Sequence, residues 1–307
     1  MSRIVVVGAG VVGLSVAHEL AVAGHQVRIV AERAASESVS AVAAAIWFPH
    51  AVAIDGGVLE SGRVTYQRLE ELAADPATAV FMRDGLVRVR RDGADLSWTA
   101  AVPGYQRTAD GVRCTVPVVE TGRYLVWLQD RVAALGVTTT VARIRATGPE
   151  ELVSEVGDPD AVVVAAGIRS GDLLGGDDEI YPIRGQVVRL ANPGLTEWFT
   201  DDDHPDGLTY VVPRTHDVVC GGTGQVGSWD EEVDAATEEA ILRRVRALVP
   251  ALAGQPVLSR AVGLRPARSA RRLERAGRVV TCYGHGGSGF TLSWGDAARV
   301  AELIGPA

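Results

Sequence analysis

The chain has 307 residues, of which 47% are hydrophobic, and a formal net charge of −8 at pH 7. A chain of this length buries about three quarters of its unfolded surface, so it needs no disulfide or metal to hold a core. The negative charge argues against a nucleic-acid partner, and the absence of lysine excludes both a P-loop lysine and a lysine Schiff base to pyridoxal phosphate.

The cysteines and histidines form no pattern that favours a disulfide or a metal centre. Cys114, Cys220 and Cys282 lie far apart outside any CxxC motif, and the six histidines include no HxxxH pair. We therefore expect no metal and a reducing compartment. Because no leader precedes Arg3 and no 18-residue apolar span occurs, we expect a cytoplasmic protein with no membrane partner. The oligomeric state stays open, with a homodimer as one option.

The first predicted element is a strand, turn and helix near the N-terminus. Residues 4–7 (IVVV) are typical of a buried strand, and Gly8, Gly10 and Gly13 follow at GxGxxG spacing before a helical pattern. In this motif the first glycine allows the tight turn, the second lets the backbone approach a pyrophosphate, and the third lets helix and strand pack closely. The positive end of the helix dipole then faces the phosphates.

The next apolar segment, Val27 to Ala31, ends at Glu32, which lies 24 residues after Gly8. A carboxylate at this position suits both hydroxyls of a ribose and repels a 2′-phosphate, so NAD and FAD both fit. The alternative is a βαβ unit that binds no ligand. The motif by itself does not say which dinucleotide binds.

Further along, segments typical of a nucleotide domain alternate with segments typical of a second domain. Residues 34–45 are mostly small, which suits close approach to a ligand. Residues 80–91 predict an antiparallel strand pair that turns at Asp84–Gly85, where the second domain begins. Residues 160–167 (DAVVVAAG) predict a buried parallel strand of the nucleotide domain. We also predict helices over 62–74, 122–135, 237–249 and 291–304, and strands over 185–190, 209–212, 218–221 and 279–284.

A second glycine loop, residues 284–289 (GHGGSG), lies more than 270 residues after the first. A cofactor longer than a simple nicotinamide dinucleotide would use both loops, which favours FAD. Residues 286–291 would then wrap the isoalloxazine ring, and the N-terminus of the following helix would stabilise negative charge on the reduced ring. The alternative is a plain glycine-rich turn.

Two further residues are candidates for substrate contacts. Pro266 disfavours helix at Arg265, so this guanidinium can be held rigidly on an extended segment for a two-point grip on a carboxylate; the alternative is an ordinary surface arginine. Tyr210 begins a predicted strand, where a packing role is the more common one. For His285, inside the second glycine loop, a role in holding the loop shape is favoured over a role as base or ring contact.

Taken together, these motifs resemble the D-amino acid oxidase family, which includes D-aspartate oxidase. The resemblance covers nearly the whole chain through IVVVGAGVVGLS, AAAIWFP, GRYLVWL, VVVAAG, RGQVV, YVVPR, CGGTGQ, VGLRPAR and CYGHGGSGFTLSWG. It implies an FAD enzyme that takes a hydride from the α-carbon of a D-amino acid. The imino acid hydrolyses to a 2-oxo acid and ammonia, and molecular oxygen reoxidises the flavin to give hydrogen peroxide.

The resemblance also implies roles for individual residues. Arg265 matches the arginine that pairs with the substrate carboxylate, Tyr210 a tyrosine that orients the substrate, and the Gly287 carbonyl the acceptor for the amine; His285 has no base role. The cofactor residues that we expect are Gly8, Ala9, Gly10, Val11, Val12, Gly13, Glu32, Arg33, Ser40, Ala44, Ala45, Ile168, Gly286, Ser288, Gly289, Phe290 and Thr291.

The predicted fold is α/β, with a Rossmann-like FAD-binding domain interleaved with an α+β substrate domain built on an antiparallel sheet. We assign residues 1–76, 142–183 and 262–307 to the first domain, and residues 77–141 and 184–261 to the second.

Three positions and one region depart from the family pattern or from one branch of it. Phe48 replaces a glutamine, Asp206 replaces a second tyrosine, and the lid region 198–208 is short and acidic. Gly224 stands where D-aspartate oxidases tend to have arginine, which favours substrates with neutral or hydrophobic side chains. The alternatives are a related oxidase of D-aspartate, glycine or sarcosine, and, from another class, an NAD-dependent dehydrogenase or a dinucleotide sensor.

Overall fold

Strands from both halves of the sequence join into one continuous sheet, described by a computed structural model of residues 1–307. At one end of this 14-stranded sheet, five neighbouring strands run parallel in the order β14, β7, β1, β2, β6. Their bounds are β1 Arg3–Val7, β2 Gln26–Ala31, β6 Thr138–Val141, β7 Ala161–Val164 and β14 Val279–His285. This is the parallel order expected of a Rossmann-like unit.

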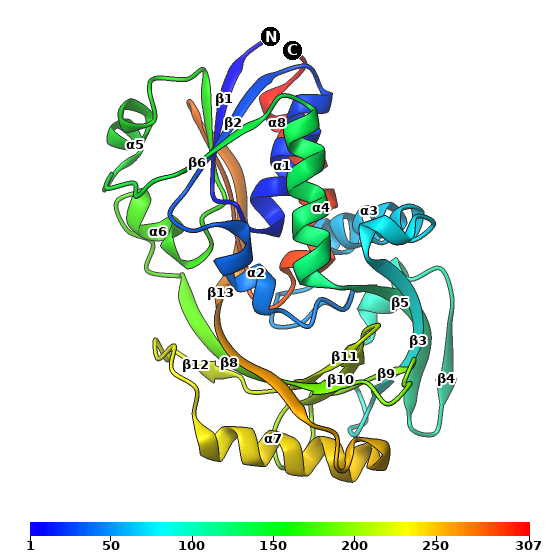
Figure 1. Ribbon diagram of the computed structural model, residues 1–307. Coiled ribbons are helices and arrows are strands. Elements are labelled where there is room, and N and C mark those ends of the chain that lie inside the picture. Colours follow the sequence, from blue (N-terminus) through cyan, green and yellow to red (C-terminus); the bar gives the residue numbers. More distant parts are fainter.

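Helices cover both faces of the parallel strands (Figure 1). On one side lie α1 (Val11–Val22), α4 (Thr121–Ala134) and α8 (Gly289–Ile304), with α3 (Gly56–Leu72) packed on α8; on the other lie α5 (Pro149–Glu155) and α6 (Ser170–Leu173). Successive side chains of β1 therefore enter different cores: Ile4 and Val6 pack with the first group, Val5 and Val7 with the second. Burial on both faces explains why β1 is apolar at every position after the exposed Arg3.

The other half of the sheet is mainly antiparallel and curves away below the helices, with α7 (Ala235–Leu248) covering its lower face in Figure 1. Its long strand β13 (Val257–Ala276) joins the halves, because it pairs first with β8 (Tyr181–Ala191) and then with β14. The remaining strands are β3 Val80–Arg88, β4 Tyr105–Thr108, β5 Gly111–Val119, β9 Trp198–Asp201, β10 Thr209–Pro213, β11 Asp217–Gly221 and β12 Gln225–Val226.

The short helical elements lie in the connections between these strands and helices. They are η1 Ala35–Glu37, α2 Val39–Val42, η2 Pro76–Thr78, η3 Ser97–Ala101, η4 Gly167–Arg169 and η5 Pro250–Leu252. None of the helices combines the length and the apolar character that crossing a bilayer requires. The two chain ends lie close together in Figure 1. Ser2 O accepts from Gln26 N at 2.9 Å, and the neighbouring His25 places its Nε2 3.0 Å from the Gly305 carbonyl oxygen.

The predicted α/β fold is confirmed, but two local predictions are wrong. Residues 80–91 do not turn at Asp84–Gly85: the segment is the single strand β3. Gly85 is needed there because a Cβ would lie 2.3 Å from the Trp198 carbonyl oxygen and 2.2 Å from its indole ring. The helix predicted from residue 62 begins at Gly56 instead, because Asp55 caps it by accepting a 2.7 Å hydrogen bond from Val58 N.

The segment 121–141 lies in a different place from the one we expected. We assigned it to the substrate domain, but β6 pairs with β2 in the parallel half and α4 packs against α1. All four residues of β6 are exposed, so this edge strand carries no apolar pattern that marks it in the sequence. The segment therefore extends the parallel half of the sheet.

Candidate active site

A cavity of about 450 Å³ lies where the two halves of the sheet meet. Of the residues predicted for the site, all line this cavity except Gly13, Ser288 and Thr291. Both glycine loops therefore reach the same space, although they lie at opposite ends of the chain. Asp206 and Gly224, two of the departures from the family pattern, do not line it.

The first glycine loop combines packing requirements with an open approach to the helix terminus. Gly8 has φ +117°, and a Cβ there would lie 2.3 Å from the Ala165 carbonyl oxygen; a Cβ at Gly13 would lie 2.0 Å from the Gly8 carbonyl oxygen. Gly10 differs, because its Cβ would meet only Ser40 Oγ, at 3.1 Å. Packing of the protein itself thus requires glycine at positions 8 and 13, whereas Gly10 leaves the backbone at the cavity surface uncovered by a side chain.

The N-terminus of α1 opens onto this uncovered part of the cavity surface. Gly10 supplies no side-chain cap, and the Val11 N–H donates a 3.0 Å hydrogen bond to Ser40 Oγ. At the end of β2, the Glu32 carboxylate lies 3.5 Å from the Nε atoms of both Arg143 and Arg169 and is about one third exposed. A helix terminus followed by an accessible carboxylate fits the pyrophosphate and ribose of a dinucleotide.

Hydrogen bonds hold the second glycine loop and the start of α8 against the backbone of residues 48–51. Ser288 Oγ accepts from His50 N at 2.8 Å and donates to the His50 carbonyl at 2.9 Å. Thr291 Oγ1 does the same with the Phe48 backbone, at 3.1 and 2.9 Å. These two hydroxyls are therefore used within the protein rather than facing the cavity. A direct cofactor contact from Ser288 or Thr291 stays a prediction.

The residues present fit FAD. Gly286, Gly287 and Gly289 line the cavity beside the N-terminus of α8. Only glycine fits at position 286, because φ is +55° and a Cβ would lie 1.9 Å from the Ala51 carbonyl oxygen. A nicotinamide dinucleotide needs only one stretch of glycine backbone at a helix N-terminus, whereas this cavity has two. The first loop would hold the pyrophosphate, Glu32 the ribose, and the second loop the flavin ring.

Arg265 and Tyr210 converge on the sheet side of the cavity. The Arg265 guanidinium lies over Gly185 of β8, where a Cβ would be 2.5 Å from Cζ, and its Nη1 donates to the Thr223 carbonyl at 2.8 Å. The Tyr210 ring lies over Gly221, where a Cβ would be 2.1 Å from ring Cζ. Burial raises the pKa of the Tyr210 phenol, although the charge and hydrogen bond of Arg265 oppose the rise. The phenol is thus protonated beside a cation.

Several cavity residues were missed by sequence reasoning. They include His50, Thr200, Asp202, Leu208 and Trp229. Each lies in a loop or at a strand end, so no periodic pattern marks it. The lid region is also smaller than predicted: Trp198–Asp201 forms β9, which leaves only residues 202–208 as a loop.

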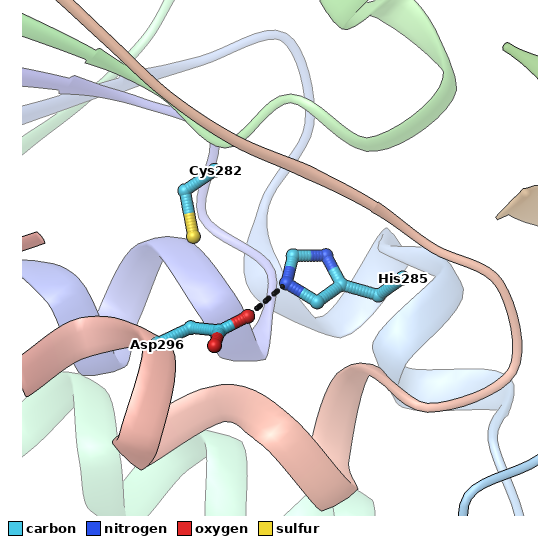
Figure 2. A group of neighbouring side chains, drawn as sticks. All are labelled: Cys282, His285 and Asp296. Carbon is cyan, nitrogen blue, oxygen red and sulfur yellow. Dashed lines mark hydrogen bonds and ion pairs between the residues drawn. The ribbon is translucent and has the colours of Figure 1, made fainter. Parts of the chain in front are cut away.

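Figure 2 shows three buried residues behind the second glycine loop: Cys282, His285 and Asp296. Their ligand atoms lie within 4.8 Å of one another. However, the Asp296 carboxylate is already bound on one oxygen by Arg271 and on the other by His285 Nε2, at 2.9 Å. Burial also raises the pKa of the Cys282 thiol to about 12, whereas zinc requires a thiolate. These contacts favour a hydrogen-bond network over a metal centre.

This network keeps His285 uncharged. Burial, reinforced by the nearby Arg271 cation, lowers the pKa of the His285 imidazole to about 3. Nε2 therefore carries the proton that it donates to Asp296, and Nδ1 points away from the carboxylate in Figure 2. Such a ring carries no second proton at neutral pH. The contacts favour the predicted role in holding the loop shape.

The cavity is lined by two glycine loops, each beside a helix N-terminus, and by an arginine and a tyrosine on the sheet. This arrangement is that of a flavin-dependent oxidoreductase. The comparison with known families agrees: residues 3–303 match the model described as FAD dependent oxidoreductase, or DAO. The chain belongs to this family, and its cofactor is FAD.

The similarity to known proteins covers nearly the whole chain. A D-amino-acid oxidase of Rubrobacter xylanophilus is 42% identical, covering 100% of this chain and 97% of its own length. Human D-aspartate oxidase is 33% identical, covering 99% of this chain and 94% of its own length. The crystal structure of iminodiacetate oxidase from Chelativorans sp. BNC1 has a TM-score of 0.77 at 20% identity, covering 98% of this chain and 95% of that one, which shows a common fold.

Proposed function

We propose that the protein oxidises D-amino acids with neutral or hydrophobic side chains to 2-oxo acids and ammonia, reducing oxygen to hydrogen peroxide. The observation that carries the proposal is the placement of Arg265 and Tyr210 in the same cavity as both glycine loops. The named D-amino-acid oxidase at 42% identity over the full chain supports the substrate class.

FAD, held by the two glycine loops and Glu32, would supply the two-electron oxidation of the substrate and the subsequent reduction of oxygen. The protein's own residues bind and orient. The Arg265 guanidinium binds the substrate carboxylate, the protonated Tyr210 phenol donates to the same group, and the Gly287 carbonyl accepts from the amine.

No protein base is required at the α-carbon. With the amine neutral, nitrogen lone-pair donation stabilises the positive charge that develops there. His285, which lies within the second glycine loop, already donates its proton to Asp296. The imino acid then hydrolyses in water to the 2-oxo acid and ammonia. Positioning and electrostatics are thus the contribution of this chain.

The first test is a peroxide assay with purified protein and added FAD over a panel of D-amino acids, with the L-enantiomers, D-aspartate, glycine and sarcosine alongside. We expect a yellow flavin spectrum and turnover of neutral D-amino acids. A protein that binds no flavin would refute the proposal. Faster turnover of D-aspartate, glycine or sarcosine would establish the alternative oxidase instead.

The second test replaces Arg265 by Ala. Losing a charge-assisted contact with the carboxylate is expected to lower kcat/KM by at least about a hundredfold, or roughly 3 kcal/mol. Arg260→Ala is the matched control, because Arg260 lies on the same strand but pairs with Glu238 outside the cavity. Equal kcat/KM values for the two variants would show that Arg265 does not bind the carboxylate.

A cytoplasmic location and a homodimer belong to the same proposal. The three cysteines are free and buried, which supports a reducing compartment. Cell fractionation tests the location, and light scattering of the holoenzyme tests the dimer.

A further inference from the structure

The loop between β9 and β10 contains Asp202, whose carboxylate side chain lines the cavity. Asp202 follows β9 directly, and its Oδ2 lies 2.9 Å from Nδ1 of His50. Both residues line the cavity, and their side chains are 42% and 26% exposed. This pair links the short lid loop to the segment that holds the second glycine loop.

The pair lies beside the proposed reacting end of the substrate. A Cβ on Gly287 would be 2.6 Å from His50 Cδ2, and Gly287 N donates to the His50 carbonyl at 3.1 Å. On the opposite side, Tyr210 pairs with Thr200, two residues before Asp202. The Asp202 charge also contributes to raising the pKa of the Tyr210 phenol. Asp202 therefore acts electrostatically on the group that we place against the substrate carboxylate.

The neighbouring aspartates differ from Asp202 in their partners. Asp201 pairs with Arg90 at 2.6 Å, and Asp203 pairs with Arg91 at 2.9 Å. Asp202 has no arginine partner, only a histidine, whose positive charge exists only when it is protonated. The carboxylate of Asp202 is thus the one in this run that keeps negative charge available to a ligand.

The other charged groups of the cavity have partners of their own, including Glu37, whose carboxylate accepts from Ala34 N at 3.2 Å. Arg169 lies 3.5 Å from Glu32, and Arg33 lies 3.7 Å from Glu231, both at the dinucleotide end. Arg265 is assigned to the substrate carboxylate. No second arginine lines the substrate end to receive a side-chain carboxylate.

We propose that Asp202, held by His50, adjusts specificity by charge: its carboxylate lowers kcat/KM for D-amino acids with acidic side chains and raises it for those with cationic side chains, relative to neutral side chains of equal shape and to an enzyme without this charge. The inference rests on the proposed function and extends it to the substrate side chain. Because Asp202 is partly exposed, solvent screens its charge, and we expect effects on the order of fivefold rather than thousands.

The experiment uses holoenzyme and two pairs of substrates that are matched in shape. D-Lysine is compared with D-norleucine, and D-glutamate with D-glutamine, as ratios of kcat/KM. Asp202→Asn preserves side-chain size and removes the charge. It is expected to lower the lysine-to-norleucine ratio and to raise the glutamate-to-glutamine ratio, each by about fivefold. Asp203→Asn is the matched control, because Asp203 does not line the cavity, and should leave both ratios unchanged.

A second measurement needs no variant. Raising the ionic strength screens an exposed charge, so both wild-type ratios should move toward the values of Asp202→Asn. Ratios that change neither with Asp202→Asn nor with salt would overturn the inference while leaving D-amino acid oxidation intact. Absence of turnover with every D-amino acid would instead refute the proposed function.

Discussion

Asp296→Asn tests the buried network behind the second glycine loop. The Asp296 side chain is fully buried and Arg271 is 10% exposed, and the two form an ion pair. Arg271 has one further polar partner, Ser61 Oγ at 3.0 Å. Asparagine keeps the volume but removes the negative charge, so the buried guanidinium loses its paired carboxylate and keeps only the charge of Asp55, with which it forms no ion pair. Burial already lowers the pKa of Arg271, which shows that its charge is poorly solvated.

Removing one partner of a buried ion pair costs about 3–5 kcal/mol, because the remaining charge stays desolvated. An unfolding entropy of about 2.1 cal mol⁻¹ K⁻¹ per residue gives about 0.64 kcal mol⁻¹ K⁻¹ over 307 residues. Dividing the free-energy cost by this entropy predicts a Tm about 5–8 °C lower than that of the wild type.

The assay is thermal unfolding of the apoprotein, followed by circular dichroism, so that flavin loss does not contribute. Glu302→Gln is the control, because the Arg299–Glu302 pair is exposed on both sides, and its Tm should change by about 1 °C or less. The double variant Arg271→Met/Asp296→Asn should recover most of the loss, since no charge then remains buried and the asparagine Oδ1 can still accept from His285 Nε2. A Tm for Asp296→Asn within 2 °C of the wild type would refute the ion-pair reasoning.

Three further perturbations follow from the contacts described above. Gly10→Ala should leave Tm almost unchanged but raise the Kd for FAD at least tenfold. Gly8→Ala should lower Tm itself, because its Cβ would lie 2.3 Å from a backbone oxygen. Equal effects of the two variants on Tm would contradict the separate roles given to Gly8 and Gly10. Gly185→Ala should raise KM with little change in Tm, because its Cβ would displace the Arg265 guanidinium, 2.5 Å away; an unchanged KM would show that the guanidinium is not held there for substrate. In urea unfolding, the free energy of unfolding of the wild type should fall relative to that of His285→Gln as pH falls from about 6.5 toward 3. The reason is that the imidazole binds a proton in the unfolded state but not in the buried folded state. Parallel curves of unfolding free energy against pH would contradict the lowered pKa of His285.

Features that depend on a few adjacent residues could be predicted from the sequence. The strand, turn and helix at Gly8 were recognisable because an apolar run, a glycine spacing and a helical period succeed one another locally. The confirmed FAD cofactor followed from a second such motif at residues 284–289. Arg265 could be singled out because Pro266 restricts the backbone beside it.

Features that depend on what packs against a residue could not be predicted. Gly85 suggests a turn in the sequence, yet it is a strand residue because Trp198 occupies the space of its side chain. The exposed strand β6 carries no apolar pattern, so only its pairing with β2 shows where it belongs. In each case the deciding neighbour is distant along the chain.

The same division applies to the site. The sequence by itself determined the fold class and the cofactor, since both follow from the conformation and chemical type of adjacent residues. The substrate roles of Arg265, Tyr210 and Gly287 came from the resemblance to a known family, and they stay predictions. Only the tertiary structure decided that Ser288 fastens the backbone of His50, that Asp296 joins Arg271 to His285, and that Asp202 reaches the cavity. These contacts join segments far apart in the chain, and they exist because the halves of one sheet meet around the cavity.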